Sequence, residues 1–150
     1  MKLEWSLKKF DALTPYELYA VLQLRNQVFV VEQHCVFQDA DDKDLHCYHL
    51  MGFYQNTLMA YTRLVPPGII YPEISIGRVV TSPLFRGRGA GKELMQKSID
   101  AAHELFGIKV IKIGAQLYLK KFYEGFGFQQ TSDVYIEDGI SHIYMIKTTS

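Results

Sequence analysis

The chain has 150 residues, of which 48% are apolar, and its formal net charge is zero. This length favours one domain with one core over residues 1–150. The neutral charge argues against a protein that binds nucleic acid or an anionic membrane through a broad basic surface. No stretch approaches the ~20 consecutive apolar residues of a membrane span, and two cysteines are too few for a disulfide framework. We therefore expect a soluble cytoplasmic protein.

The N-terminal residues predict a strand, a helix and a loop. Residues 4–8 alternate polar and apolar side chains, as a half-buried strand does. The tetrapeptide Thr-Pro-Tyr-Glu at 14–17 has the N-cap, the proline and the glutamate of a helix start, and apolar residues continue at helical spacing to about Val31. The polar and acidic residues 32–44 then predict a loop.

The central residues predict three strands. Two apolar runs, 47–54 and 58–65, are joined by the turn-forming residues 55–57 and predict a β-hairpin. After a Pro-Pro-Gly breaker, residues 73–81 are rich in β-branched side chains and predict a third strand. Gly77 lies inside this strand, which indicates a bulge or a close approach of backbone.

The C-terminal part predicts alternating helices and strands. Residues 89–106 keep a helical period, 108–115 predict a strand, 117–126 a short helix, and 134–147 a hairpin that turns at an Asp-Gly pair. The predicted order is β-α-β-β-β-α-β-α-β-β. Such a chain is expected to form a mixed central β-sheet flanked by helices, an α/β sandwich of three layers.

A glycine-rich stretch at 82–95 separates the third central strand from the following helix. Glycines let a backbone approach a ligand, and the free N–H groups of a helix start attract anions. Arg86, Arg88 and Lys92 add positive charge. A Walker A loop is excluded because Arg86 and Glu93 stand where glycine and Ser/Thr are required, and the dinucleotide spacing GxGxxG is also absent. The stretch therefore predicts an anion site of another kind.

Three segments resemble the GCN5-related N-acetyltransferase (GNAT) superfamily. Arg86, Gly89 and Gly91 have the Arg-x-x-Gly-x-Gly spacing of its acetyl-CoA-binding motif. "FYEGFGF" at 122–128 is similar to its Tyr-x-x-x-Gly-Phe segment, and "LRNQVFVVEQ" at 24–33 is similar to its first-helix signature. Within the superfamily the chain resembles the ElaA group, which shares these segments and others such as "IGRVV" and "YIEDGISHIYM". The resemblance implies the GNAT fold and acetyl-CoA as co-substrate.

The resemblance also implies where acetyl-CoA binds. In this superfamily it lies in a V-shaped opening between the fourth and fifth strands. Backbone groups of Val79, Val80 and Thr81 would pair with the pantetheine arm, and the N–H of Val80 or a neighbour would polarise the thioester carbonyl. The pyrophosphate would be held by the glycine-rich loop and the lysine after it: Arg86, Gly87, Arg88, Gly89, Ala90, Gly91 and Lys92.

The proton chemistry is assigned in part by the same resemblance. Tyr123 has the position of a general acid that protonates the coenzyme A thiolate, and it would contact the cofactor. Gln116 stands where many members have an asparagine that contacts coenzyme A. His142 and Glu32 are both candidates for the general base, and a water relay is a third possibility.

The sequence gives little support for a metal site. Histidine and cysteine are adjacent at 34–35 and 46–47, but the spacings typical of zinc ligands are absent. We expect no metal and two neutral thiols near strand edges. Residues 39–44 fail as a calcium loop because Asp44 and Leu50 stand where glycine and glutamate are required. These acids flank the expected acceptor entrance and would suit a cationic amine, and we expect them to form a solvated loop.

The function favoured by these residues is direct transfer of an acetyl group from acetyl-CoA to a primary amine of a small molecule or peptide. An alternative is a module that binds acetyl-CoA as a sensor, without turnover. Nucleic-acid binding through the arginines of the glycine-rich loop is a third possibility, which the neutral net charge disfavours. We expect acetyl-CoA and an amine as partners, no nucleic acid or membrane, and a C-terminal hairpin that is free to pair in a homodimer.

Overall fold

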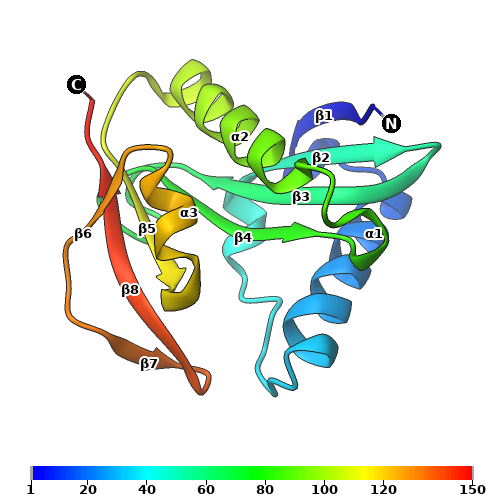
Figure 1. Ribbon diagram of the computed structural model, residues 1–150. Helices are drawn as coiled ribbons and strands as arrows, with labels where there is room; N and C mark the ends of the chain where they lie inside the picture. The colour runs from blue at the N-terminus through cyan, green and yellow to red at the C-terminus, as the bar shows by residue number, and fades with distance from the viewer. Residues whose placement is uncertain (1, 150) are drawn as a thin grey trace.

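Two four-stranded β-sheets organise the protein in a computed structural model, which describes residues 2–149 (Figure 1). The first sheet has the order β1-β2-β3-β4, and in the second sheet β8 lies between β5 and β6 and also pairs with β7. All ladders within the two sheets are antiparallel. The strands are β1 (Glu4–Lys9), β2 (Tyr48–Tyr54), β3 (Thr57–Val65), β4 (Ser75–Thr81), β5 (Ile111–Gln116), β6 (Phe128–Gln130), β7 (Tyr135–Glu137) and β8 (Ile140–Lys147).

The helices begin and end close to the predicted residues. Helix α1 (Pro15–Arg25) has the predicted capping box, in which Thr14 Oγ1 accepts from the N–H of Glu17 and Glu17 Oε1 accepts from the N–H of Thr14. Beyond α1 the chain continues as a π-helical segment, η2 (Asn26–Glu32). The other helices are α2 (Ala90–Phe106) and α3 (Lys120–Glu124), with short 3-10 turns η1 (Phe10–Ala12), η3 (Lys43–His46), η4 (Pro83–Phe85) and η5 (Leu117–Leu119).

Helices α1 and α2 cover opposite faces of the first sheet (Figure 1). Neighbouring residues of a strand point to opposite faces, so Met51 packs with Val21 of α1 while Leu50 packs in the cluster that contains Leu94 of α2. The core of the second sheet lies against α2 and α3. These layers confirm the predicted α/β fold. In residues 2–149 no helix is long and apolar enough to cross a membrane.

One strand and one helical feature were not anticipated from the sequence. Strand β6 has only three residues and pairs with the end of β8, so the observed order has one more strand than predicted. The helix predicted to reach about Val31 does extend to Glu32, but its last seven residues are π-helical. Both predicted hairpin turns are present, at Gln55–Asn56 and Asp138–Gly139, where the paired residues have positive φ.

The two sheets meet at one point. Ile74 and Ile111 form a parallel bridge, and the N–H of Lys112 donates to the carbonyl of Ile74 at 2.8 Å. In the described part of the chain this is the only backbone pairing between β4 and β5, so the edge of β4 beyond Ile74 is not covered by another strand. Strands β4 and β5 diverge from this bridge, as the V-shaped opening expected between them requires.

Strand β4 contains the predicted bulge. Tyr61 of β3 pairs with Val80 and Arg63 pairs with Gly77, so two residues of β4 stand opposite one residue of β3. The left-handed φ of 51° falls on Arg78, not on the neighbouring Gly77. Such a conformation costs a non-glycine residue on the order of 1–3 kcal/mol and persists only where its surroundings hold it.

The acidic loop differs from its prediction, because its aspartates are ion-paired to arginines. Arg25 of α1 is fully buried, and its Nη1 lies 2.7 Å from Oδ1 of Asp44 while its Nε lies 2.9 Å from Oδ2 of Asp39. Arg63 of β3 is also buried and binds Asp41 through two hydrogen bonds of 2.8 Å. The loop is therefore not simply solvated, since a buried guanidinium requires a carboxylate partner.

Further ion pairs join these aspartates to one another and connect two of them, Asp39 and Asp41, to Arg78 of β4. Arg63 adds a bond of 3.0 Å to Asp44, which joins it to the Arg25 pair. The Nε of Arg78 lies 2.9 Å from Oδ1 of Asp39, an ion pair in which the N–H does not point at the oxygen, and its Nη2 donates to the carbonyl of Asp39 at 3.0 Å. We call this set the charge cluster: Arg25, Arg63, Arg78, Asp39, Asp41 and Asp44.

The charge cluster predicts a loss of stability in acid. Burial alone would raise the pKa of Asp41, but the hydrogen bonds and charge of Arg63 and the charge of Arg78 lower it to about 2. Because the folded pKa lies below the unfolded one, the stabilisation is present above pH ~4 and is lost as the pH falls towards 2. The shift corresponds to roughly 2 kcal/mol, which solvent screening of this partly exposed group reduces to about 1 kcal/mol.

We therefore expect the unfolding free energy of the wild type to fall by about 1 kcal/mol more than that of Asp41→Asn between pH 5 and 2.5. Urea denaturation at several pH values measures this difference. Asp100→Asn, which removes an aspartate on the exposed surface of α2, is the matched control and should keep the wild-type slope. Equal slopes for the wild type and Asp41→Asn would contradict the role of the ion pair.

Candidate active site

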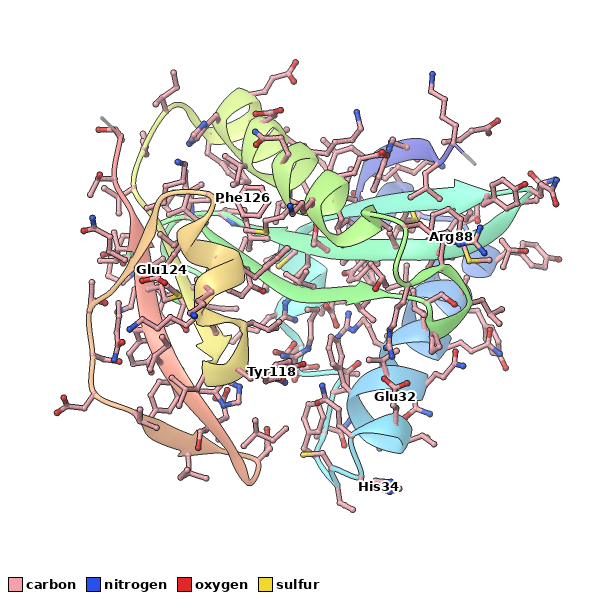
Figure 2. All side chains as sticks on the ribbon, in the orientation of Figure 1. Glu32, His34, Arg88, Tyr118, Glu124 and Phe126 are labelled. Carbon is pink, nitrogen blue, oxygen red and sulfur yellow. The ribbon has the colours of Figure 1, made fainter. Side chains whose placement is uncertain are left out.

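A cavity of about 410 Å³ opens where β4 and β5 diverge. Its walls come from the π-helical segment η2, β4, the loop before α2, β5, α3 and β8. Figure 2 shows Glu32 and Tyr118 on opposite sides of this opening, and both line the cavity. The lining includes eight residues that the sequence assigned to the site: Val79, Val80, Thr81, Arg86, Gly91, Gln116, Tyr123 and His142.

The remaining loop residues lie outside the cavity wall. Ala90 is buried in the core beneath α2, and the guanidinium carbon of Arg88 lies 5.3 Å from the ring centroid of Phe85. Lys92 borders a second, open hollow between α2 and α3. Gly87 and Gly89 form exposed backbone. These five residues contribute charge or backbone shape, and only Arg86 and Gly91 of the loop face the cavity itself.

The glycine-rich loop has the geometry of an anion site. Gly87 and Gly89 have φ of 78° and 73°, and a Cβ at either position would meet no atom within 4 Å. The backbone conformation therefore explains why these positions are glycine, since a side chain would have enough space. Gly89 is the N-cap of the 17-residue helix α2 and supplies no capping side chain. The first N–H groups of α2 thus have no side-chain cap, which is the arrangement that attracts an anion.

Arg86 makes an ion pair across the mouth of the cavity. Its two terminal nitrogens lie 2.9 Å and 2.6 Å from the carboxylate oxygens of Glu32. The hydrogen bond from Arg86 holds the pKa of Glu32 below its usual value, which makes this carboxylate a weaker base. A pyrophosphate at Arg86 would compete with Glu32 for the same guanidinium.

Tyr123 lies at the inner wall of the cavity. Its side chain is buried, and its ring contacts Phe122 and Phe128 edge-on, so its orientation is set by packing. Burial, with a further contribution from Tyr118, raises the pKa of its phenol to about 12. The hydroxyl therefore keeps its proton at neutral pH and can act as an acid, not as a base.

The geometry of His142 determines which ring nitrogen can act as a base. Its Nδ1 lies 2.7 Å from the carbonyl oxygen of Ile140, and because a carbonyl only accepts, Nδ1 carries the proton. In the neutral ring the lone pair is then on Nε2, which lies 3.7 Å from Oε2 of Glu137. The ring stacks on Tyr135 and is mostly buried, so it is held in place.

Two contacts bridge the halves of the molecule at the far end of the cavity. The amide of Gln116 donates to Gln33 Oε1 at 3.4 Å, and the thiol of Cys35 donates to the carbonyl of Asp138 at 3.0 Å. The first contact shows that the glutamine found in place of the usual asparagine points into the cavity region. The second gives Cys35, in the segment predicted as a loop, a hydrogen bond to the β7–β8 turn.

The other cysteine has the properties of an inert thiol. Burial raises the pKa of Cys47 to about 11, and its Sγ lies 3.1 Å from the carbonyl of Lys43, just before β2. It is therefore a neutral thiol at physiological pH. Among residues 2–149, no three histidine, cysteine, aspartate or glutamate side chains are grouped as a metal site requires.

Several lining residues were not singled out from the sequence. Phe29, Gln33 and Phe37 reach the cavity because the π-helical segment and the acidic loop pass beside β4. Glu137 and Asp138 reach it because the β7–β8 turn folds back towards Cys35. No spacing in the sequence places these two segments together, since they are about a hundred residues apart.

Known proteins of the same fold provide an independent comparison. Protein ElaA of Escherichia coli (strain K12) is 40% identical over 147 residues, which cover 97% of this chain and 96% of that protein. Its crystal structure matches with a TM-score of 0.91 and 39% identity, over 97% of this chain and 99% of the other. A crystal structure of an acyl-CoA N-acyltransferase from Pseudomonas aeruginosa matches with a TM-score of 0.94 and 42% identity, again over 97% and 99%.

More distant likeness concerns the fold alone. A GNAT family acetyltransferase from Elizabethkingia anophelis, solved with acetyl-CoA bound, has a TM-score of 0.63 and 16% identity over 98% of each chain. The family profile described as acetyltransferase (GNAT) domain matches residues 46–149. With the relatives above, this match makes the protein an acyl-CoA-dependent acyltransferase. The chain belongs to the GNAT acetyltransferase family.

Proposed function

We propose that the protein transfers an acetyl group from acetyl-CoA directly to a primary amine of a small molecule or peptide. The observation that carries this proposal is the cavity at the divergence of β4 and β5. It brings together an uncovered strand edge, a helix start suited to an anion, a buried phenol and an imidazole with a free lone pair. Each of these groups matches one requirement of acetyl transfer.

The backbone of β4 receives the pantetheine arm and the thioester in this proposal. Val79 lies in the bulge, Val80 and Thr81 follow it, and all three line the cavity, where no second strand covers this edge of β4 in the described chain. The N–H of Val80 points at β3, because the N–H of Ser82 donates to the carbonyl of Met59 and the alternation of antiparallel pairs then makes Tyr61 and Val80 a hydrogen-bonded pair. The donor to the thioester carbonyl, where negative charge develops in the tetrahedral intermediate, is therefore assigned to the N–H of its neighbour Val79. One preorganised donor of this kind typically stabilises the transition state by ~3 kcal/mol.

Two side chains handle the protons. Nε2 of His142 takes a proton from the attacking ammonium group, and the resulting imidazolium lies close to the Glu137 carboxylate, which stabilises it. The amine nitrogen then attacks the carbonyl carbon and the carbon–sulfur bond breaks. Tyr123 gives its proton to the departing thiolate, and the phenolate regains a proton from the acylated nitrogen as the amide forms, which leaves one net proton on His142. Glu32 is less suited to be the base because Arg86 lowers its pKa.

The acceptor end of the cavity favours a cationic amine. Three of the four aspartates of residues 39–44, which the sequence suggested for this role, are paired with arginines, and Asp42 is exposed outside the charge cluster. Glu137 and Asp138 line the cavity instead, and both are exposed at the β7–β8 turn. Their negative charge would attract an acceptor that carries a second positive charge.

Acceptor-dependent release of coenzyme A tests the proposed transfer. We expect polyamines, aminoglycosides or lysine peptides to raise thiol release from acetyl-CoA above the rate without acceptor. A diamine should react faster than a monoamine of equal length, and Glu137→Gln should reduce this preference. If the protein binds acetyl-CoA while no amine raises thiol release, the sensor function is correct and the transfer is not.

Removal of the Tyr123 hydroxyl tests the general acid. Phenylalanine keeps the ring contacts with Phe122 and Phe128, so Tyr123→Phe should fold as the wild type does. We expect kcat to fall by about 100-fold while the Kd of acetyl-CoA changes little. Because the phenol has a pKa of about 12, its titration should cause no loss of rate below about pH 10. An unchanged kcat would exclude Tyr123 as the acid.

A substitution that keeps one nitrogen of the imidazole tests the general base. In His142→Asn the amide can still donate to the carbonyl of Ile140, but the lone pair of Nε2 is lost. We expect kcat/KM to fall by about 100-fold while the Kd of acetyl-CoA changes little. An unchanged kcat/KM in His142→Asn would assign the base to another group or to water.

A further inference from the structure

Arg78 is the only residue inside a strand of residues 2–149 that has a positive φ. Together with Val79 it stands opposite Thr62, and this two-to-one pairing forms the β4 bulge. The bulge sets the direction of its own backbone N–H groups. The proposed donor to the thioester carbonyl, the N–H of Val79, belongs to the second residue of the bulge.

The side chain of Arg78 is held by one short segment, residues 37–41. Its Nε lies 2.9 Å from Oδ1 of Asp39, and its Nη2 lies 3.0 Å from the carbonyl oxygen of Asp39 and 3.3 Å from Oδ2 of Asp41. The ring centroid of Phe37 lies 5.7 Å from the guanidinium carbon. Arg78 thus combines a strained backbone conformation with a side chain that is held by four contacts.

The anchoring segment is itself fixed from the other side. Asp39 is bound by Arg25 of α1, and Asp41 is bound by Arg63 of β3, both of which are buried. A continuous set of ion pairs therefore connects α1 and β3 to the bulge in β4. A strained backbone conformation persists where the surroundings determine it in this way.

We propose that Arg78 is a positioning residue, whose pairing with Asp39 and Asp41 fixes the β4 bulge and so aims the N–H of Val79 at the thioester carbonyl. This role rests on the function proposed above. Arg78 lines the cavity, but it acts here through the backbone and needs no contact with the reacting atoms. Its ion pairs would thus control catalysis, in addition to stability.

Two substitutions of Arg78 separate the anchor from the backbone conformation. Arg78→Ala removes the anchor and leaves a residue that disfavours positive φ, whereas Arg78→Gly removes the anchor but adopts positive φ without strain. The glycine variant therefore keeps the test valid if the alanine variant does not fold. Lys8→Ala is the matched control, because it breaks an ion pair of 3.0 Å, to Glu17, at a distance from the cavity.

The decisive measurement is the infrared stretch of the thioester carbonyl in bound [1-13C]acetyl-CoA, which needs no acceptor. A donor aimed at this oxygen lowers the stretching frequency relative to acetyl-CoA in water. We expect the shift in the wild type and in Lys8→Ala, and its loss in both Arg78 variants. With the best acceptor of the amine panel, kcat should fall at least tenfold in both Arg78 variants while the Kd of coenzyme A changes less than threefold.

The outcomes distinguish the two proposals. A wild-type carbonyl shift and kcat in Arg78→Gly would overturn the positioning role, because the backbone conformation alone would then suffice. The absence of a carbonyl shift in the wild type would instead overturn the assigned donor, and the positioning role with it. Partial recovery of the shift in Arg78→Lys, which restores one cation to the carboxylates, would support the positioning role.

Discussion

The need to pair three buried or partly buried guanidinium groups determines much of this structure. Arg25, Arg63 and Arg78 come from a helix and two strands, and an ion removed from water costs several kcal/mol unless a counter-ion replaces the lost solvation. The aspartates of one short loop supply that counter-charge. The loop must therefore run over the end of α1 and beside β4, and this route makes residues such as Phe37 part of the cavity wall. A surface loop thereby becomes a structural element of the site.

Much of the fold could be predicted because its signals are local. The capping box at Thr14, the turns at Asn56 and Gly139, and the glycines of positive φ before α2 each follow from the chemistry of a few neighbouring residues. Strand β6 has no such signal, since three residues give no recognisable alternation and only their pairing with β8 defines them. The π-helical segment after α1 also has no recognisable sequence signal, because its apolar spacing resembles that of an α-helix.

The motifs of the candidate site could be recognised in the sequence, but its ion pairs could not be predicted. Arg86 and Tyr123 were identified by spacing and resemblance, whereas the pairing of Arg86 with Glu32 depends on how η2 and the glycine-rich loop meet in space. The charge cluster did leave one usable signal. Arg25 falls at an apolar position of its helix and Arg63 lies within an apolar strand, and each position would have indicated a buried charge that needs an acidic partner.

The central place of β8 in the second sheet has a consequence for biosynthesis. The first sheet has all of its strands once Thr81 has been made, but β5, β6 and β7 each pair with β8 and so wait for Lys147. At roughly 5–20 residues per second, this interval lasts several seconds on the ribosome. During it β4 presents an uncovered edge, which is a site for wrong pairing with other nascent chains. The arrangement that leaves room for a co-substrate is thus also the point at which the emerging chain is most vulnerable to aggregation.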